Sequence, residues 1–523
     1  MEAKKTALWL RIKQWSGTEA FRYVAAGFIV MVLALLSALG KYAPALAVTI
    51  ALAEVLVLLI VPLIRRDVVL YYMLFIVFAG TALSNATFVY NDYNAPLYTF
   101  VQLPFVQSTH VPVLLFLPLL FLFGRGEIPF LSKLSEHKAL RTTLRFMCLM
   151  FLTGALFGFV VRWCNDNSLR DTYDLWYYIY EGNLLIYLNL LFLSVGLTYC
   201  FVTSKKLVGE FENYLLVFLF GIAAATVFSV LFGWSADYMD NTTLLLSQSA
   251  IYGVFLLVYP LYGKKPKSVK ILSLVLGAAS VFAMLFKSSE LGGKWWIYVF
   301  FTLLVLLFKM FFSKKRVLKI AAVAVALGAV GGVVLFMNVD FDLGLSETKM
   351  HQFFDLLNVF DRHWYSSLPE SPKVRIDEFV NVLIEYVKKP YFALFGKGFG
   401  ATVTKHWGET DWSIDSVNVF SQLELKNQVF GIMHETVNRL ILAFGVVGIA
   451  FIVREIWFAI RRFRDSFPCL IGFVWFIFFY NTVYSALYIG LVCLLFSKIG
   501  NGETAQAEPS SPDAPEEENA VEQ

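Results

Sequence analysis

The chain has 523 residues, of which 58% are hydrophobic, 17% aromatic and only 16% charged. This composition excludes an ordinary soluble globular protein, in which charged side chains make up about a quarter of the residues. The formal net charge of +4 is small for this length, and the basic residues stand in short groups between apolar runs, so no nucleic-acid partner is expected. The sequence predicts an integral membrane protein.

Apolar runs recur along most of the chain. A bilayer core about 30 Å thick requires about 20 mostly apolar residues in each helical span. We predict an all-α polytopic membrane protein with about fourteen transmembrane helices. The predicted spans are 21–40, 43–63, 68–88, 104–124, 146–161, 184–202, 214–234, 242–262, 271–286, 296–313, 320–337, 436–453, 467–481 and 484–497.

Basic residues mark alternate connections between these spans, as at Arg65–Arg66, Lys205–Lys206 and Arg461–Arg462. Because cytoplasmic loops are enriched in Lys and Arg, we expect these connections and both chain termini on the cytoplasmic side. A single re-entrant element over 467–497 is the alternative to two final spans and would give thirteen crossings. The positive charge of Lys498 favours the even count.

The predicted organisation has five parts. They are a cytoplasmic N-terminus (1–20), a bundle of about eleven transmembrane helices (21–338), a large external loop (339–435), C-terminal transmembrane helices (436–497) and a disordered acidic cytoplasmic tail (498–523).

The external loop contains two segments with apolar residues at helical spacing, Met350–Tyr365 and Arg375–Lys389. We expect two amphipathic helices at the rim of the bilayer. Pro390 ends the second helix, and Gly396–Gly400 predicts a turn or hinge.

The order of five features in and after this loop carries a resemblance. These features are Arg375, Pro390, the Gly396–Gly400 turn, His434 and the Gly445–Gly448 pair. In this order, over about residues 375–450, the chain resembles the superfamily of O-antigen ligases and O-antigen polymerases. Their large external loop carries an Arg, then a Pro and a G-x-G turn, then a His that opens a helix with an internal G-x-x-G. The resemblance implies a GT-C-type glycosyltransferase architecture in a bacterial inner (cytoplasmic) membrane and a metal-independent enzyme.

The chemistry of two residues fits that implication. A transferase outside the cytoplasm lacks nucleotide sugars, so its donor is a glycan on a polyprenyl (undecaprenyl) pyrophosphate. We expect the Arg375 guanidinium to hold the diphosphate by paired hydrogen bonds. We expect the neutral His434 imidazole to accept the proton of the acceptor hydroxyl, and direct displacement would invert the anomeric centre. The bland alternatives are a lipid-headgroup contact for Arg375 and an interfacial helix start for His434.

Four further residues are candidates for substrate binding: Lys294, Arg362, Asn438 and Gly398. Many family members carry a second phosphate-binding Arg at the outer end of an earlier helix, where this chain has Lys294 instead. Lys294 can supply a point charge without the bidentate geometry of Arg, or it can serve as an interfacial anchor beside Trp295. The alternative role of Asn438 is support of its helix. Neither a metal site nor a cofactor is expected, because the sequence has no obvious Asp/His ligand cluster in its outer loops and no C-x-x-C pair.

The sequence therefore predicts a membrane glycosyltransferase that polymerises O-antigen or exopolysaccharide repeat units. An O-antigen ligase that transfers the glycan to lipid A core is the first alternative, since it uses the same donor and differs in acceptor. A polysaccharide flippase or transporter and a scaffolding protein are alternatives from other classes. The expected partners are the lipid-linked oligosaccharide donor, a glycan or lipid A core acceptor, membrane lipids, and a flippase and chain-length regulator.

Overall fold

The computed structural model describes somewhat more than half of the chain, and most of that part is helical. The described residues are 19–38, 44–81, 130–163, 184–232, 252–263, 265–286, 307, 309–311, 316–317, 319–320, 323–324, 363–368, 370–410, 412, 428–431, 433, 436–478 and 484–499. Within them, three helices are long and apolar enough to cross a membrane: Lys138–Val161, Lys205–Leu231 and Val437–Arg462. Shorter apolar helices are Ala20–Leu36, Val48–Val61, Val68–Gly80, Leu190–Thr203 and Tyr252–Leu261.

The helices that coincide with predicted spans surround an apolar core. They are α2 (Glu19–Ala38), α3 (Pro44–Arg65), α4 (Val68–Gly80), α7 (Lys138–Trp163), α8 (Leu184–Thr203), α9 (Lys205–Leu231), η5 (Tyr259–Leu261), α11 (Lys267–Phe286), α19 (Thr436–Arg462), α20 (Phe467–Phe478) and α21 (Tyr484–Phe496), with the short α6 (Phe130–Glu136) before α7. The predicted span 104–124 lies outside the described residues, as do nearly all of 296–313 and 320–337. The mostly helical fold of a membrane protein is confirmed, and the number of spans stays a prediction.

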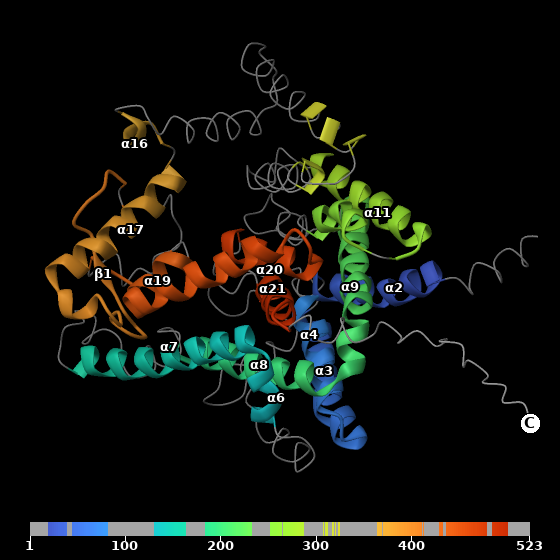
Figure 1. Cartoon of the computed structure of the whole chain (residues 1–523), viewed down its shortest axis with the longest axis horizontal. Helices are drawn as coiled ribbons and strands as arrows, with labels where there is room; N and C mark the ends of the chain where they lie inside the picture. Colours follow the sequence, from blue (N-terminus) through green and yellow to red (C-terminus); the bar gives the residue numbers. More distant parts are fainter. Residues whose placement is uncertain are drawn as a thin grey trace, which may run out of the picture.

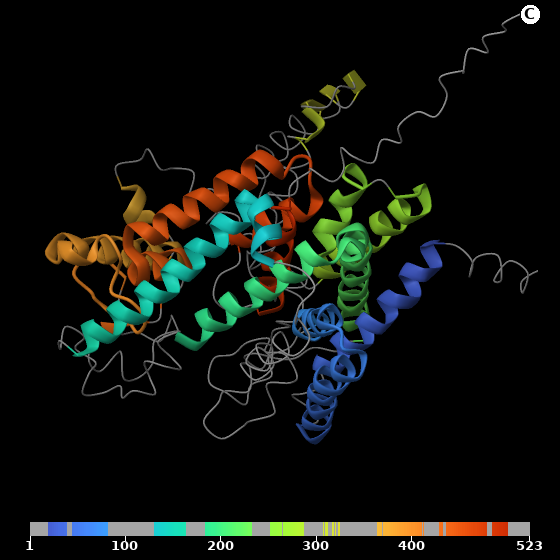
Figure 2. The ribbon, with the colours of Figure 1, turned by 60° about the horizontal axis from the view of Figure 1, so that its bottom comes forward.

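The segment 339–435, which is predicted to be an external loop and keeps that name below, contributes five elements among the described residues. They are α16 (Trp364–Ser367), α17 (Glu370–Lys388), η6 (Pro390–Phe392), β1 (Val403–Thr404) and β2 (Val429–Phe430). The two strands pair antiparallel, with Val403 opposite Phe430. The helix predicted at Arg375–Lys389 is confirmed as α17, while the one predicted at Met350–Tyr365 lies outside the described residues except for its last three. Figure 1 shows α17 and β1 at one end of the molecule and α2, α9 and α11 at the other, and Figure 2 keeps this separation.

Helices α7 and α19 run antiparallel. Thr143, near the start of α7, donates to Glu455 near the end of α19 at 2.8 Å, while Gly154 further along α7 lies against Phe444 near the start of α19. The basic first turns of α7 and the basic last turn of α19 therefore lie at the same end of the pair. This agreement fits the predicted topology, which puts both ends in the cytoplasm.

A buried ion pair fastens the C-terminal helices at that same end. The side chains of Glu455 and Lys498 are fully buried, and the Lys498 ammonium donates to the Glu455 carboxylate and to Thr143. Arg454 donates to the same carboxylate and to the Ala139 carbonyl. Lys498 is thus part of the packed bundle and not the first residue of a solvated tail. Because Lys498 forms an ion pair with Glu455, its positive charge is weaker evidence for the predicted topology.

The ion pair gives a stability prediction. Replacing Lys498 with Met leaves the buried Glu455 carboxylate with Arg454 as its only ionic partner among the described residues, so we expect the free energy of unfolding to fall by about 1–3 kcal/mol. The double variant Lys498→Met/Glu455→Gln removes both charges and should recover most of that loss. Thermal melting of the detergent-solubilised protein, followed by gel filtration, measures both. A single variant as stable as the unmodified protein would contradict the prediction.

Candidate active site in the external loop

Helix α19 is broken at Gly445, where φ is 58° and ψ is −137°. In an unbroken helix the N–H groups of residues 446 and 447 would bond to the carbonyls four residues earlier. Here Val446 donates to the carbonyl of Ala393 at 2.8 Å, and Val447 donates to that of Leu394 at 3.2 Å. Both acceptors belong to the turn that follows η6. The backbone groups released by the break are therefore satisfied by the external loop.

The glycine turn also donates to the two carbonyl groups of α19 that the break releases. Lys397 donates its backbone N–H to the carbonyl of Leu442 at 3.0 Å, and Gly398 donates to that of Ala443 at 2.9 Å. Gly396, Gly398 and Gly400 all have positive φ, which is a conformation that residues with a Cβ rarely adopt. Two intrahelical hydrogen bonds are thus exchanged for four bonds between the turn and α19. We call this contact the turn–break contact.

Helix α7 closes the other side of the turn. Phe399 donates to the carbonyl of Gly154 at 2.9 Å, and a Cβ on Gly398 would lie 2.0 Å from the backbone nitrogen of Gly158. The predicted turn at Gly396–Gly400 is confirmed. Gly398, a candidate for substrate binding, is buried with its N–H bonded to α19, so its observed role is to let three backbone segments approach closely.

The turn–break contact gives a second prediction. A Cβ at Gly445 would lie 2.3 Å from the carbonyl oxygen of Ala393, and the positive φ adds strain. We expect Gly445→Ala to lower the free energy of unfolding by at least about 2 kcal/mol. Gly209→Ala in α9 is the matched control, because nothing lies within 4 Å of the added methyl group. Equal melting temperatures for the two variants would argue against the contact.

Arg375 lies beside the first turn of α19. The Asn438 side chain, which is buried, donates to the backbone carbonyl of Arg375 at 3.0 Å and to the Glu378 carboxylate at 3.2 Å. Thus Arg375 is joined to a residue that follows it by 63 positions in the sequence. Helix α19 begins at Thr436, two residues after His434.

The structure brings together two of the predicted site residues, Arg375 and Asn438. Gly398 lies in the turn–break contact, and His434, Lys294 and Arg362 lie outside the described residues. The position of Asn438 shows how it acts: its amide ties α17 to α19, which is a positioning role. No group of three His, Cys, Asp or Glu able to hold a metal ion occurs in the part of the chain that the structure describes.

A buried amide, Asn381, organises the segment that covers α17. Its Oδ1 accepts from the backbone N–H groups of His406 and Trp407 at 2.6 and 2.9 Å. Its Nδ2 donates to the backbone carbonyls of Trp407 and Asp377 at 2.8 and 2.7 Å. One turn earlier, the buried Asp377 carboxylate accepts from the side chain of Thr410. These two residues hold the segment 405–410 against the helix.

Sequence reasoning missed a polar cluster around His406. Thr404 and His406 are two residues apart along an extended segment, so their side chains lie on one side, and the Thr404 hydroxyl is 2.7 Å from the imidazole Nε2. The same hydroxyl lies 3.4 Å from the buried Glu385 carboxylate, which pairs with Lys397 at 3.7 Å. The i, i+2 spacing of Thr404 and His406 is the sequence feature that could have indicated this cluster.

The charge state of His406 follows from this setting. Partial burial and the positive charge of Lys388 lower the pKa of its imidazole below the usual range, against an opposing effect of Glu385. The ring is therefore neutral at pH 7 and can accept a proton.

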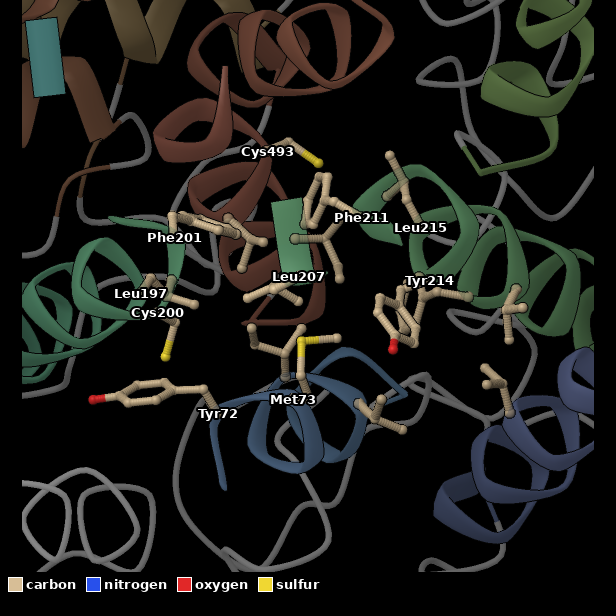
Figure 3. A pocket seen from close by; sticks show the side chains of 17 residues that line it. Tyr72, Met73, Leu197, Cys200, Phe201, Leu207, Phe211, Tyr214, Leu215 and Cys493 are labelled. Atoms are coloured by element: carbon tan, nitrogen blue, oxygen red, sulfur yellow. The ribbon is translucent and has the colours of Figure 1, made fainter. Parts of the chain in front are cut away.

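The bundle also contains an apolar cavity of about 100 Å³, drawn in Figure 3. Its lining comes from α2, α4, α8, α9 and α21 and includes Tyr72, Cys200, Phe211 and Cys493. The lining is almost entirely aliphatic and aromatic, which suits hydrocarbon and not transfer chemistry. Figures 1 and 2 place these helices away from α17 and β1.

Comparisons with protein-family models, with curated proteins and with solved structures give no match for this chain. The resemblance to O-antigen ligases and polymerases therefore rests on its motif order. Of that motif, the structure describes Arg375, Pro390, the glycine turn and the break at Gly445. It joins Arg375 to the first turn of α19 and the glycine turn to the break at Gly445, further along the same helix.

The Asn381 contacts give a third prediction. Asn381→Leu keeps the volume but removes four hydrogen bonds to the backbone, three of them to His406 and Trp407, so we expect segment 405–410 to detach more often. Chymotryptic cleavage after Trp407 should rise by about tenfold or more, which corresponds to about 1.4 kcal/mol. Glu409→Gln, at an exposed position of the same segment, is the control: it removes only an exposed ion pair with Lys373 and should raise the cleavage rate much less. Slow cleavage of the Asn381→Leu variant would contradict this account.

Proposed function

We propose that this protein is a membrane glycosyltransferase that transfers glycan from a polyprenyl pyrophosphate donor on the external face of a bacterial inner membrane. The proposed product is a lengthened O-antigen or exopolysaccharide chain. The observation that carries the proposal is the Asn438 contact, which holds Arg375 beside the start of α19, two residues after His434 in the sequence.

The setting of Arg375 suits a diphosphate. A helix N-terminus carries partial positive charge, and its first backbone N–H groups favour anions. The backbone carbonyl of Arg375 is bonded to that end of α19, and its side chain is half-buried, where screening by water is weaker. In the proposed reaction it offsets the charge that builds on the leaving diphosphate.

The proposed step is a single displacement. The acceptor hydroxyl oxygen forms a bond to the anomeric carbon of the donor glycan, the bond from that carbon to the phosphate oxygen breaks, and polyprenyl pyrophosphate leaves. His434 takes the hydroxyl proton as a general base. The configuration of the anomeric carbon inverts, and the step uses no metal or cofactor.

The experiment is an assay of the purified protein with a lipid-linked oligosaccharide. We expect release of polyprenyl pyrophosphate without added metal, and a loss of at least about 100-fold in Arg375→Ala and His434→Ala. Lys373→Ala is the matched control, because Lys373 is a cation on the same helix that pairs with Glu409 at 3.3 Å. It should retain transfer.

The product separates the two acceptors. A ladder of repeat units identifies a polymerase, whereas glycan joined to lipid A core identifies a ligase. Full transfer by both Ala variants, or a strict requirement for a divalent cation, would overturn the proposal. Association with a flippase and a chain-length regulator is a further expectation of the same proposal.

A further inference from the structure

One face of α17 exposes apolar side chains, although the helix buries polar side chains together with Val374 and Val382. Asp377 and Asn381 are fully buried, whereas Phe379, Leu383 and Val387 are 38%, 39% and 82% exposed. These three apolar residues follow one another at intervals of four, so they form one stripe along the helix. A helix on the surface of a soluble domain shows the reverse distribution.

The buried polar side chains are occupied. Asp377 and Asn381 bond to segment 405–410, and Glu378 accepts from Asn438 of α19. Two faces of α17 are thus covered by protein, and the apolar stripe lies on the remaining face. Exposure of this stripe to water is unfavourable, so lipid or another protein surface is expected to cover it.

The stripe is continuous with the exposed face of a membrane-spanning helix. Beyond α17 it passes through Tyr391 and Leu394, which are 65% and 52% exposed. The Leu394 carbonyl accepts from the backbone of Val447, so the stripe reaches α19 at the turn–break contact. From there α19 exposes apolar side chains at intervals of three and four residues: Val446, Ile449, Val453, Trp457 and Ile460.

The residues of the stripe lie at different positions along the axis of α19. Arg375 lies level with Asn438, whereas Leu394 lies level with Val447, which is nine residues or about 13 Å further along the helix. The stripe therefore descends from the outer end of α19 toward its middle. Lys388, which is exposed, stands beside Val387 and can extend its ammonium to lipid phosphates while its stem covers apolar surface.

We propose that α17 is an interfacial helix whose apolar stripe, from Phe379 to Leu394, is embedded in the acyl chains of the membrane leaflet on the side of the loop. The occupant of the stripe is bilayer lipid, and the continuity with the exposed face of α19 carries this assignment. If the proposed function holds, the embedding also sets the depth of Arg375, one helical turn before Phe379, at the level where a lipid diphosphate lies. The embedding itself does not depend on that function.

The test measures depth in the full-length protein. The five native cysteines are replaced, and an environment-sensitive fluorophore is attached at Leu383→Cys or Val387→Cys. Val387 is the more exposed of the two, so its variant keeps the test valid if the other folds poorly. Ser366→Cys and Glu409→Cys, at exposed polar positions of the same loop, are matched controls. The proteins are reconstituted in phosphatidylcholine and phosphatidylglycerol vesicles that contain lipids with a quencher on the acyl chain.

We expect the two stripe labels to be quenched by the lipid at least about twice as strongly as the controls and to be shielded from iodide in the water phase. Iodide quenching equal to that of the controls would overturn the proposal. So would shielding that disappears when the protein is diluted in lipid, because a second copy of the chain would then be the occupant.

The same samples separate this proposal from the proposed function. Lipid quenching without glycan transfer would leave the interfacial helix in place and count against the transferase. Glycan transfer with water-exposed labels would support the transferase and overturn the interfacial helix.

Discussion

Four backbone hydrogen bonds join the glycine turn to the break in α19, and they fix the position of the external loop against this helix. A helix that opens inside a membrane protein must find new partners for its released N–H and C=O groups, because lipid offers none. The turn after Pro390 supplies these partners, two donors and two acceptors, at Gly445. Glycine is required on both sides of the contact because the backbones approach too closely for a Cβ. Once the turn is fixed, α17 and Arg375 have little freedom relative to α19.

Several buried polar side chains among the described residues form hydrogen bonds or ion pairs between elements. Asn381 and Asp377 hold a covering segment to α17, Asn438 joins α17 to α19, and Glu455 joins α19 to Lys498. Burial of such groups is favourable only when each has partners. The apolar residues are then left for the outer surface, which is the arrangement expected where lipid replaces water. The same logic explains both the membrane-spanning helices and the proposed interfacial position of α17.

These contacts between elements explain how residues far apart in the sequence can act at one place. The proposed transferase requires a cation for the donor phosphate and a base for the acceptor hydroxyl. In the proposal Arg375, joined to the start of α19, is the cation, and His434, which precedes that helix by two residues, is the base. His406 is a neutral imidazole in the same loop, bonded to Thr404 through its ring and to Asn381 through its backbone. The loop is thus a folded part of the enzyme site in this proposal, and not a passive connection.

The sequence by itself determined the class of protein, the helix α17 to within a few residues, its end before Pro390 and the turn at Gly396–Gly400. These features depend on composition, on apolar spacing and on residues with special backbone conformations, all of which are local. Only the tertiary structure decided that the turn fills a break at Gly445, that Lys498 is buried against Glu455, and that His406 belongs to a polar cluster. Each of these contacts joins groups that are separated in the chain or lie on different elements, and the periodicity of one segment does not encode its partner.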